Sequence, residues 1–191
     1  MILLCDTCSV LMLIRIAPDM FLDERFECVT INKVCEEIFH TPRFKTKYSW
    51  REKYKSKLKS LGSTIEDDPS VQSLYKIIDR LVVTAGVVNK KNGRPFDLSK
   101  TDKKIAACAA SLKYAVSTVE HNLTDFLIQE FEIKVIKPLA VINYWLKKEL
   151  VEWDDNKQSI LEDWANCGEA SQRKKDIQQF KELTGRVYPG L

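Results

Sequence analysis

The sequence lacks any apolar run that approaches the roughly 20 residues of a membrane-spanning helix. Its opening segment, MILLC, has no basic residues before it, and Asp6 and Arg15 interrupt the apolar stretch that follows. This is not the pattern of a signal peptide, so we predict a cytoplasmic protein with no membrane association. The sequence also has only two histidines, His40 and His121, and no serine or cysteine hydrolase signature accompanies either of them.

Cysteine is present in modest number, at positions 5, 8, 28, 35, 108 and 167. In a cytoplasmic chain we expect reduced thiols that pack as small apolar side chains, and no disulfide framework. Cys5 and Cys8 form a C-x-x-C between a predicted strand and a predicted helix, as in thioredoxin-like redox pairs, but Cys5 belongs to the apolar strand. Zinc bound by Cys5, Cys8, Cys28 and Cys35 is a weaker alternative, because the last two lack the usual short spacing.

The composition indicates one globular domain with an appendage. The 191 residues are 45% hydrophobic and 30% charged, which is enough for a substantial core and a well-solvated surface. The net charge of +3 is unevenly distributed. The segment RFKTKYSWREKYKSKLKS, residues 43–60, holds eight Lys or Arg and one Glu, a net charge of +7, which leaves −4 for the remainder. We call residues 43–60 the basic segment.

Hydrophobic periodicity predicts short strands that alternate with helices. The predicted strands are 1–5, 26–31, 114–118 and 133–136. The predicted helices are 9–16, 32–40, 43–60, 71–86, 100–113, 123–131 and 139–150, with loops at 62–70 and 89–99. This alternation is typical of an α/β fold with a central parallel sheet and helices on both faces. We assign residues 1–149 to this domain and 150–191 to a helical C-terminal extension.

Acidic residues follow the predicted strands. In parallel sheets, ligands bind beyond the carboxyl ends of the strands. Asp6 comes directly after the first strand, where Ser9 is available to cap the following helix. The other acids near strand ends or helix starts are Glu36, Glu37, Asp102, Glu120 and Asp125. We expect these carboxylates to meet at one edge of the sheet.

Carboxylates that meet in this way repel one another unless a cation is present. Mg²⁺ or Mn²⁺ prefers oxygen ligands and can activate water for attack on a phosphodiester. Each acid also has a purely structural explanation. Ser99 and Asp102 have the spacing of a capping box, and Glu36 and Glu37 suit the positive end of a helix.

Four segments together resemble the PIN domain, a metal-dependent nuclease fold. These are LLCDTCSVLML, VCEEI, LSKTDKKIAACAAS and VSTVEHNL. The family motifs fall on Asp6 with Ser9, Glu37 with Ile38, Asp102 with Ile105-Ala106-Ala107, and Thr118 with Glu120. The resemblance covers residues 1–138, and the third segment is its most specific part.

The resemblance implies a Mg²⁺- or Mn²⁺-dependent endoribonuclease. It also permits a role as the toxin of a toxin–antitoxin pair, with an antitoxin partner and a homodimeric assembly. It implies catalytic and metal-binding roles for Asp6, Glu37, Asp102 and Glu120, with Asp125 as a further metal ligand. Ser9, Thr118 and Asn122 would position water or phosphate. The family usually has Asp at the position of Glu120 and often another at Asn122, so the alternative is an inactive PIN-like module that binds RNA or a partner protein.

The basic segment is the predicted RNA contact. Its cationic residues would engage the phosphate backbone, and Phe44, Tyr48 or Trp50 would stack on unpaired bases. The cations are Arg43, Lys45, Lys47, Arg51, Lys53 and Lys55. The alternative is a solvated amphipathic helix whose aromatic side chains face the core and whose lysines face water.

Overall fold

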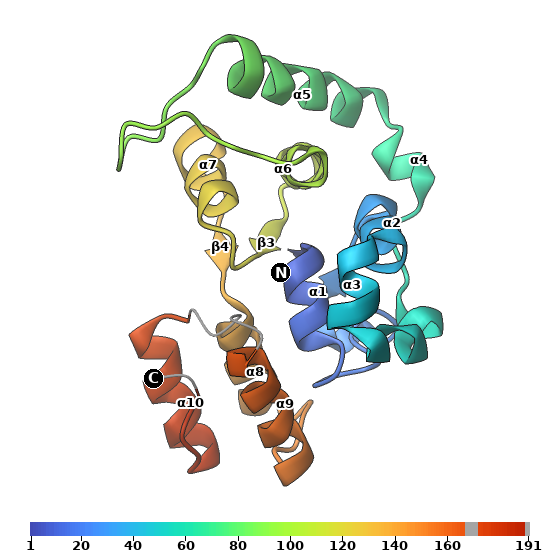
Figure 1. Ribbon diagram of the computed structural model, residues 1–191, viewed down its shortest axis with the longest axis vertical. Coiled ribbons are helices and arrows are strands. Elements are labelled where there is room, and N and C mark those ends of the chain that lie inside the picture. Colours follow the sequence, from blue (N-terminus) through green and yellow to red (C-terminus); the bar gives the residue numbers. More distant parts are fainter. Residues whose placement is uncertain (167–171, 190–191) are drawn as a thin grey trace.

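The computed structural model describes residues 1–166 and 172–189. At its centre lie four parallel strands in the order β2-β1-β3-β4 (Figure 1). They are β1 (Leu3–Cys5), β2 (Cys28–Val29), β3 (Ala115–Ser117) and β4 (Val135–Ile136). In register, Leu4 of β1 pairs with Val29 on one side and with Val116 on the other. The predicted α/β class with a parallel sheet is confirmed.

The two central strands are buried along their whole length, as expected where helices cover both faces of a sheet. Each strand is shorter than its apolar run in the sequence. The helices that follow the strands in the chain are α1 (Thr7–Leu13), α2 (Asn32–His40), α7 (His121–Phe131) and α8 (Pro138–Lys147). Helix α6 (Lys100–Leu112) precedes β3. Its small residues Ala106, Ala107 and Ala109 are fully buried, which lets this helix pack closely against its neighbours.

Asp6, rather than Ser9, caps helix α1. The Asp6 carboxylate accepts a hydrogen bond of 2.7 Å from the backbone N–H of Ser9. The helix therefore begins at Thr7, two residues before the predicted start, and Ser9 lies inside its first turn. The Ser9 hydroxyl instead accepts a hydrogen bond from Ser117 of β3.

The basic segment is not one amphipathic helix, which corrects the prediction. It forms α3 (Pro42–Lys47) and a 3₁₀ helix, η2 (Ser49–Lys57), separated by Tyr48. The side chain of Arg51 turns back onto the chain and donates to the carbonyl oxygens of Ile38 at 3.0 Å and Tyr48 at 3.3 Å. The contact to Ile38 provides a donor for a carbonyl group in the last turn of α2, where the helical ladder ends.

Two further predictions change between residues 60 and 100. The predicted loop 62–70 contains a short helix, α4 (Ser63–Glu66), whose Glu66 carboxylate accepts from the first backbone N–H of α2. The predicted helix 71–86 is α5 (Pro69–Asp79), and it continues into a π-helical turn over Arg80–Thr84. The loop at 89–99 is confirmed, with one antiparallel bridge between Val88 and Pro95.

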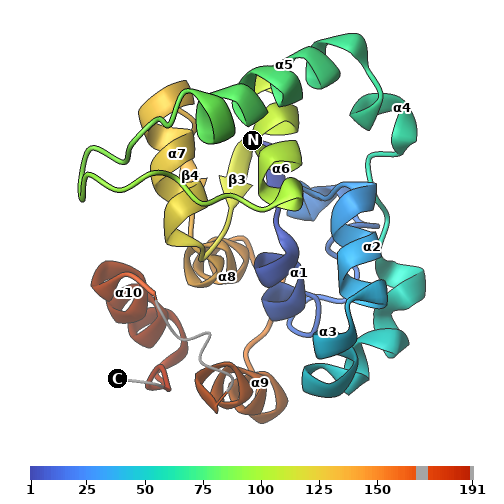
Figure 2. The same cartoon turned by 45° about the horizontal axis from the view of Figure 1, so that its top comes forward.

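The C-terminal extension is helical and packs against the rest of the protein (Figures 1 and 2). It contains α9 (Asp155–Asn166) and α10 (Lys174–Thr184). Helix α9 buries Ile160, Leu161 and Trp164, and its Asp163 forms an ion pair of 2.7 Å with Arg15. Parts of the predicted extension, residues 167–171 and 190–191, lie outside the described residues. In the part that the structure describes, no helix is long and apolar enough to cross a membrane.

Candidate active site

Five carboxylates line one pocket of about 340 Å³, and four of them come from four separate segments. Asp6 follows β1, Glu37 lies on α2, Asp102 lies on the first turn of α6, and Glu120 precedes α7. These are the four acids that the sequence predicts at the carboxyl edge of the sheet. The rest of the lining consists of Thr7, Cys8, Arg43, Phe44, Asp97, Ser99, Asn122 and Leu123.

Asp6 is the most buried of the four acids, with 3% of its surface exposed. Burial raises its pKa from the usual value to about 7, and the nearby charge of Asp102 adds to this. Hydrogen bonds from Thr118 and Ser9 act in the opposite direction and are outweighed. A carboxylate in this position is stabilised by any cation that enters the pocket.

Asp102 caps its helix and also lines the pocket. Its carboxylate accepts from the Ser99 N–H at 2.9 Å, and the Ser99 hydroxyl accepts from the Asp102 N–H at 3.1 Å, which completes a capping box. Burial raises the pKa of Asp102, and the charges of Glu120 and Glu37 raise it further. The capping role and the pocket are therefore compatible, because the cap holds the carboxylate at the pocket wall.

Glu37 and Glu120 are fixed by contacts to their neighbours in the pocket. The Thr7 hydroxyl donates to Oε2 of Glu37 at 2.8 Å. The Thr118 hydroxyl accepts from the Glu120 N–H at 3.0 Å, and the Cys8 thiol lies 3.7 Å from Glu120 Oε1. By contrast, Glu36 faces away and pairs with Lys33 at 2.9 Å.

Two cationic residues lie near the acids. Arg43 lines the pocket, and Lys137, which follows β4, is buried and donates to the carbonyl oxygen of Val119 at 3.1 Å. Burial lowers the pKa of Lys137, although the charges of Asp6 and Glu120 partly oppose this. Within residues 1–166 and 172–189, neither Lys nor Arg forms an ion pair with any of the four pocket acids.

The described residues contain no group of three or more Asp, Glu, His or Cys side chains arranged so that it could hold a metal ion. The site is thus not an all-protein cage. Mg²⁺ rarely uses one, since it commonly takes one or two carboxylates and completes its shell with water and phosphate oxygens. A buried Asp6 with a raised pKa, in a pocket lined by four further carboxylates, fits such an ion by its donor chemistry.

Asp125 is not brought together with the other acids. It lies on α7, where its carboxylate accepts from Asn89 at 2.9 Å and pairs with Lys91. These contacts hold the 89–99 loop against the helix. The prediction that Asp125 supplies a metal ligand is corrected accordingly, because a lysine already neutralises it and it does not line the pocket.

No family model matches the chain, and neither do the curated proteins or the solved structures with which it was compared. The likeness to PIN domains therefore rests on the four sequence segments quoted above. The structure shows how those segments are arranged in space.

The cysteines do not favour the redox or zinc alternatives. Cys5 and Cys28 are buried in the core, and both are free thiols. Among the described side chains, no three cysteines gather at a site suited to zinc. Cys167 lies outside the described residues.

The predicted RNA contacts fall into two groups. Arg43, Lys45, Lys47, Lys53 and Lys55 are exposed. Arg51 is only 5% exposed and serves the backbone contacts described above, so its predicted role in binding phosphate is wrong.

The aromatic side chains of the basic segment pack mainly inward. Phe44 and Tyr48 are buried, with ring centroids 5.6 Å apart, so neither presents a ring face to bases in solution. Trp50 is half-buried and lies 5.8 Å from Tyr48. The alternative of inward-facing aromatics and outward-facing lysines thus describes most of this segment.

Sequence reasoning missed Asp97, Thr7 and Cys8 as parts of the pocket. Asp97 lies in the 89–99 loop, two residues before the Ser99 cap. An acidic residue directly ahead of a capping box was the available signal, and the loop that holds it contacts α7 through Asn89 and Asp125.

Proposed function

We propose that this protein is a Mg²⁺- or Mn²⁺-dependent endoribonuclease with a PIN-like site. One observation carries the proposal: five carboxylates, four of them from separate segments, line one pocket beyond the ends of parallel strands, and none of them has a basic ion-pair partner in the described part of the chain. Such a pocket is unfavourable for the empty protein and favourable for a divalent cation.

Asp6, Glu37, Asp102 and Glu120 would hold the ion, directly or through water. A bound divalent ion would supply charge stabilisation on the phosphodiester and a more acidic water. The chain contributes the fixed orientation of the acids, through Thr7 to Glu37, Ser99 to Asp102 and Thr118 to Asp6. Arg43, at the same pocket, is placed to bind a phosphate oxygen.

RNA is preferred to DNA because of the resemblance to PIN domains. The exposed Lys45, Lys53 and Lys55 provide a positive surface next to the pocket residue Arg43, which suits a polyanion. Cytoplasmic location, a toxin role with an antitoxin partner, and a homodimer are part of the same proposal. The toxin role, the antitoxin partner and the homodimer follow from the family resemblance alone.

The test is cleavage of a mixed RNA substrate with Mn²⁺, with and without EDTA, by the wild type and by Asp6→Asn. We expect cleavage by the wild type with Mn²⁺ only, and at least a hundredfold loss in Asp6→Asn, which keeps the helix cap because Asn caps as well as Asp. A second pair sharpens the test: Glu37→Gln should lose activity, whereas Glu36→Gln, one residue away and outside the pocket, should keep it. Cleavage that survives EDTA or Asp6→Asn would rule out the metal-nuclease proposal.

A second candidate is a PIN-like module that binds RNA or protein without cutting. The absence of a three-ligand group among the described residues favours it, together with Glu120 and Asn122 at positions where the family usually has Asp. A wild type that binds RNA but cleaves none under any metal condition would support this module. In that case, Glu120→Asp with Asn122→Asp is the variant that should restore cleavage.

A further inference from the structure

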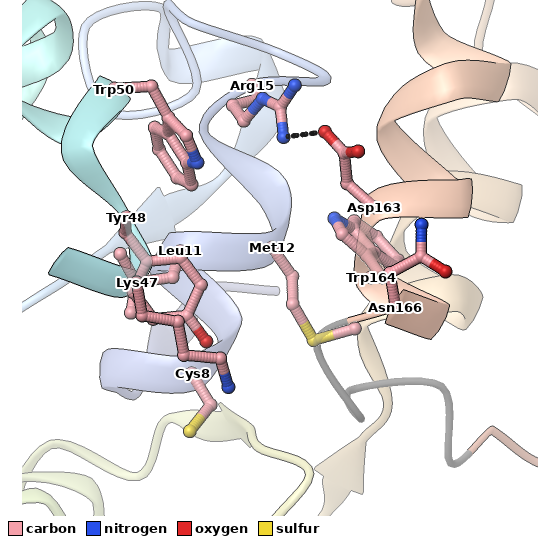
Figure 3. Close-up of a pocket in the computed structure, with 10 residues that line it drawn as sticks. All are labelled: Cys8, Leu11, Met12, Arg15, Lys47, Tyr48, Trp50, Asp163, Trp164 and Asn166. Carbon is pink, nitrogen blue, oxygen red and sulfur yellow. Dashed lines mark hydrogen bonds and ion pairs between the residues drawn. The ribbon is translucent and has the colours of Figure 1, made fainter. Parts of the chain in front are cut away.

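A second pocket adjoins the acidic one. Cys8 lines both cavities, so they meet at the first turn of α1. The second pocket measures about 230 Å³ and has walls from α1, the basic segment and α9 (Figure 3). Its lining is Cys8, Leu11, Met12, Arg15, Lys47, Tyr48, Trp50, Asp163, Trp164 and Asn166. The C-terminal extension is therefore part of its construction.

Trp164 supplies an unpartnered hydrogen-bond donor in this pocket. Its side chain is 4% exposed, and its indole N–H has no acceptor among the described residues. In Figure 3 the indole nitrogen lies on the side of the ring that faces across the cavity toward Met12 of α1. A buried donor without an acceptor is unfavourable by about 1–3 kcal/mol, so an acceptor atom of a ligand would be bound favourably there.

The opposite wall offers a flat surface made of an aromatic ring and a guanidinium plane. The Arg15 guanidinium lies 5.0 Å from the centroid of the Trp50 ring, and its Nη1 is held by Asp163 at 2.7 Å. Aromatic rings and guanidinium planes are the surfaces on which unpaired bases stack. The amide of Asn166 adds one donor and one acceptor group suited to the edge of a base.

We propose that this second pocket is a base subsite, which binds one unpaired nucleobase of the strand whose backbone lies in the acidic pocket. Trp164 would donate to a carbonyl oxygen or ring nitrogen of the base, and Trp50 with Arg15 would contact its face. The cavity is smaller than the roughly 300–1,000 Å³ of pockets for drug-sized ligands, which suits a single base. This inference rests on the proposed function, because it places RNA in the acidic pocket.

The decisive variant is Trp164→Phe, which removes the N–H group and keeps an aromatic ring in the core. The matched control is Trp145→Phe, since Trp145 on α8 is also fully buried with an unpartnered N–H but does not line this pocket. Trp50→Leu changes the opposite wall independently. The measurement is fluorescence anisotropy of a labelled single-stranded oligoribonucleotide in Ca²⁺, an oxygen-ligating divalent ion that neutralises the pocket carboxylates in place of the Mn²⁺ used for cleavage. An abasic oligonucleotide of the same length is the second probe.

We expect Trp164→Phe and Trp50→Leu to bind the base-containing probe about three- to tenfold more weakly than wild type, and Trp145→Phe to bind it equally. All four proteins should bind the abasic probe alike. Equal binding of the base-containing probe by wild type, Trp164→Phe and Trp50→Leu would overturn the subsite, as would no binding by the wild type. The expected pattern without any cleavage by the wild type in Mn²⁺ would support the subsite and reject the nuclease.

Discussion

The hydroxyl of Thr7 donates a 2.8 Å hydrogen bond to the carboxylate of Glu37 and so joins the first residue of α1 to the middle of α2. The two residues are 30 positions apart in the chain. Glu37 is one of the acids predicted from the sequence, whereas Thr7, which orients it, is not. It makes Thr7 a positioning residue of the proposed site.

Thr7→Val should therefore weaken metal use more than it weakens the fold. The variant loses the hydrogen bond that orients Glu37, so we expect the Mn²⁺ concentration for half-maximal cleavage to rise about three- to tenfold. The free energy of unfolding should fall by about 1 kcal/mol. Thr184→Val is the control, because it removes a 2.8 Å hydroxyl contact to Phe180 in α10, away from the pocket. A similar rise in that control would show that the metal effect is a general consequence of instability.

The pKa of Asp6 predicts a pH-dependent stability. Because burial raises it to about 7 in the folded state, the folded protein binds more protons than the unfolded chain between about pH 4 and pH 7. The free energy of unfolding in EDTA should thus fall as pH rises through this range, and the loss should be complete above pH 7. Asp6→Asn removes the ionisation and should stabilise the protein by roughly 2–4 kcal/mol at pH 8 and by little at pH 4.

Urea denaturation in EDTA at pH 4, 6 and 8 measures this difference. Asp163→Asn is a suitable control, since its exposed carboxylate pairs with Arg15 outside the acidic pocket. A stability change in Asp6→Asn that is the same at every pH would contradict the buried-carboxylate explanation.

Divalent ions should stabilise the wild type against heat. At a concentration one hundred times the dissociation constant, Mn²⁺ would add about 2.7 kcal/mol to the free energy of unfolding. The gain in Tm should grow from pH 5 to pH 8, because the ion competes with protons at Asp6. Differential scanning fluorimetry with Mn²⁺ measures it, and Asp102→Asn should reduce the shift while Asp125→Asn leaves it unchanged. An equal reduction of the Tm shift in Asp125→Asn would indicate that Asp125 also binds the metal ion.

Substitutions of Arg51 and Lys53 should have different effects, the first on stability and the second on RNA binding. Arg51→Met removes the side-chain donor of the Ile38 carbonyl and should lower the free energy of unfolding by about 1–3 kcal/mol. Lys53→Met, at an exposed position, should change the free energy of unfolding by less than about 0.5 kcal/mol. It should reduce the slope of log RNA affinity against log salt concentration by the amount expected for one phosphate contact. Chemical denaturation and a salt titration of RNA binding test the pair. Greater loss of stability in Lys53→Met than in Arg51→Met would reverse the assignment.

The order of elements and the positions of the four acids could be predicted from the sequence. Short apolar runs alternating with helical periods determine a parallel sheet, and parallel strands bring their carboxyl ends to one edge whatever the loops do. Asp6, Glu37, Asp102 and Glu120 are therefore placed near one another by local pattern and chain order. Their burial and hydrogen-bond partners are not contained in that pattern.

Tertiary structure decided the features that depend on contacts between distant segments. Arg51 is buried because its side chain donates to the carbonyl oxygens of Ile38 and Tyr48, and Asp125 lies outside the acidic pocket, where it pairs with Lys91. Helix α9 builds a wall beside α1 through the pairing of Arg15 with Asp163, 148 positions apart. Periodicity reports only which faces are apolar, whereas the partner of each polar group is fixed when the whole chain packs.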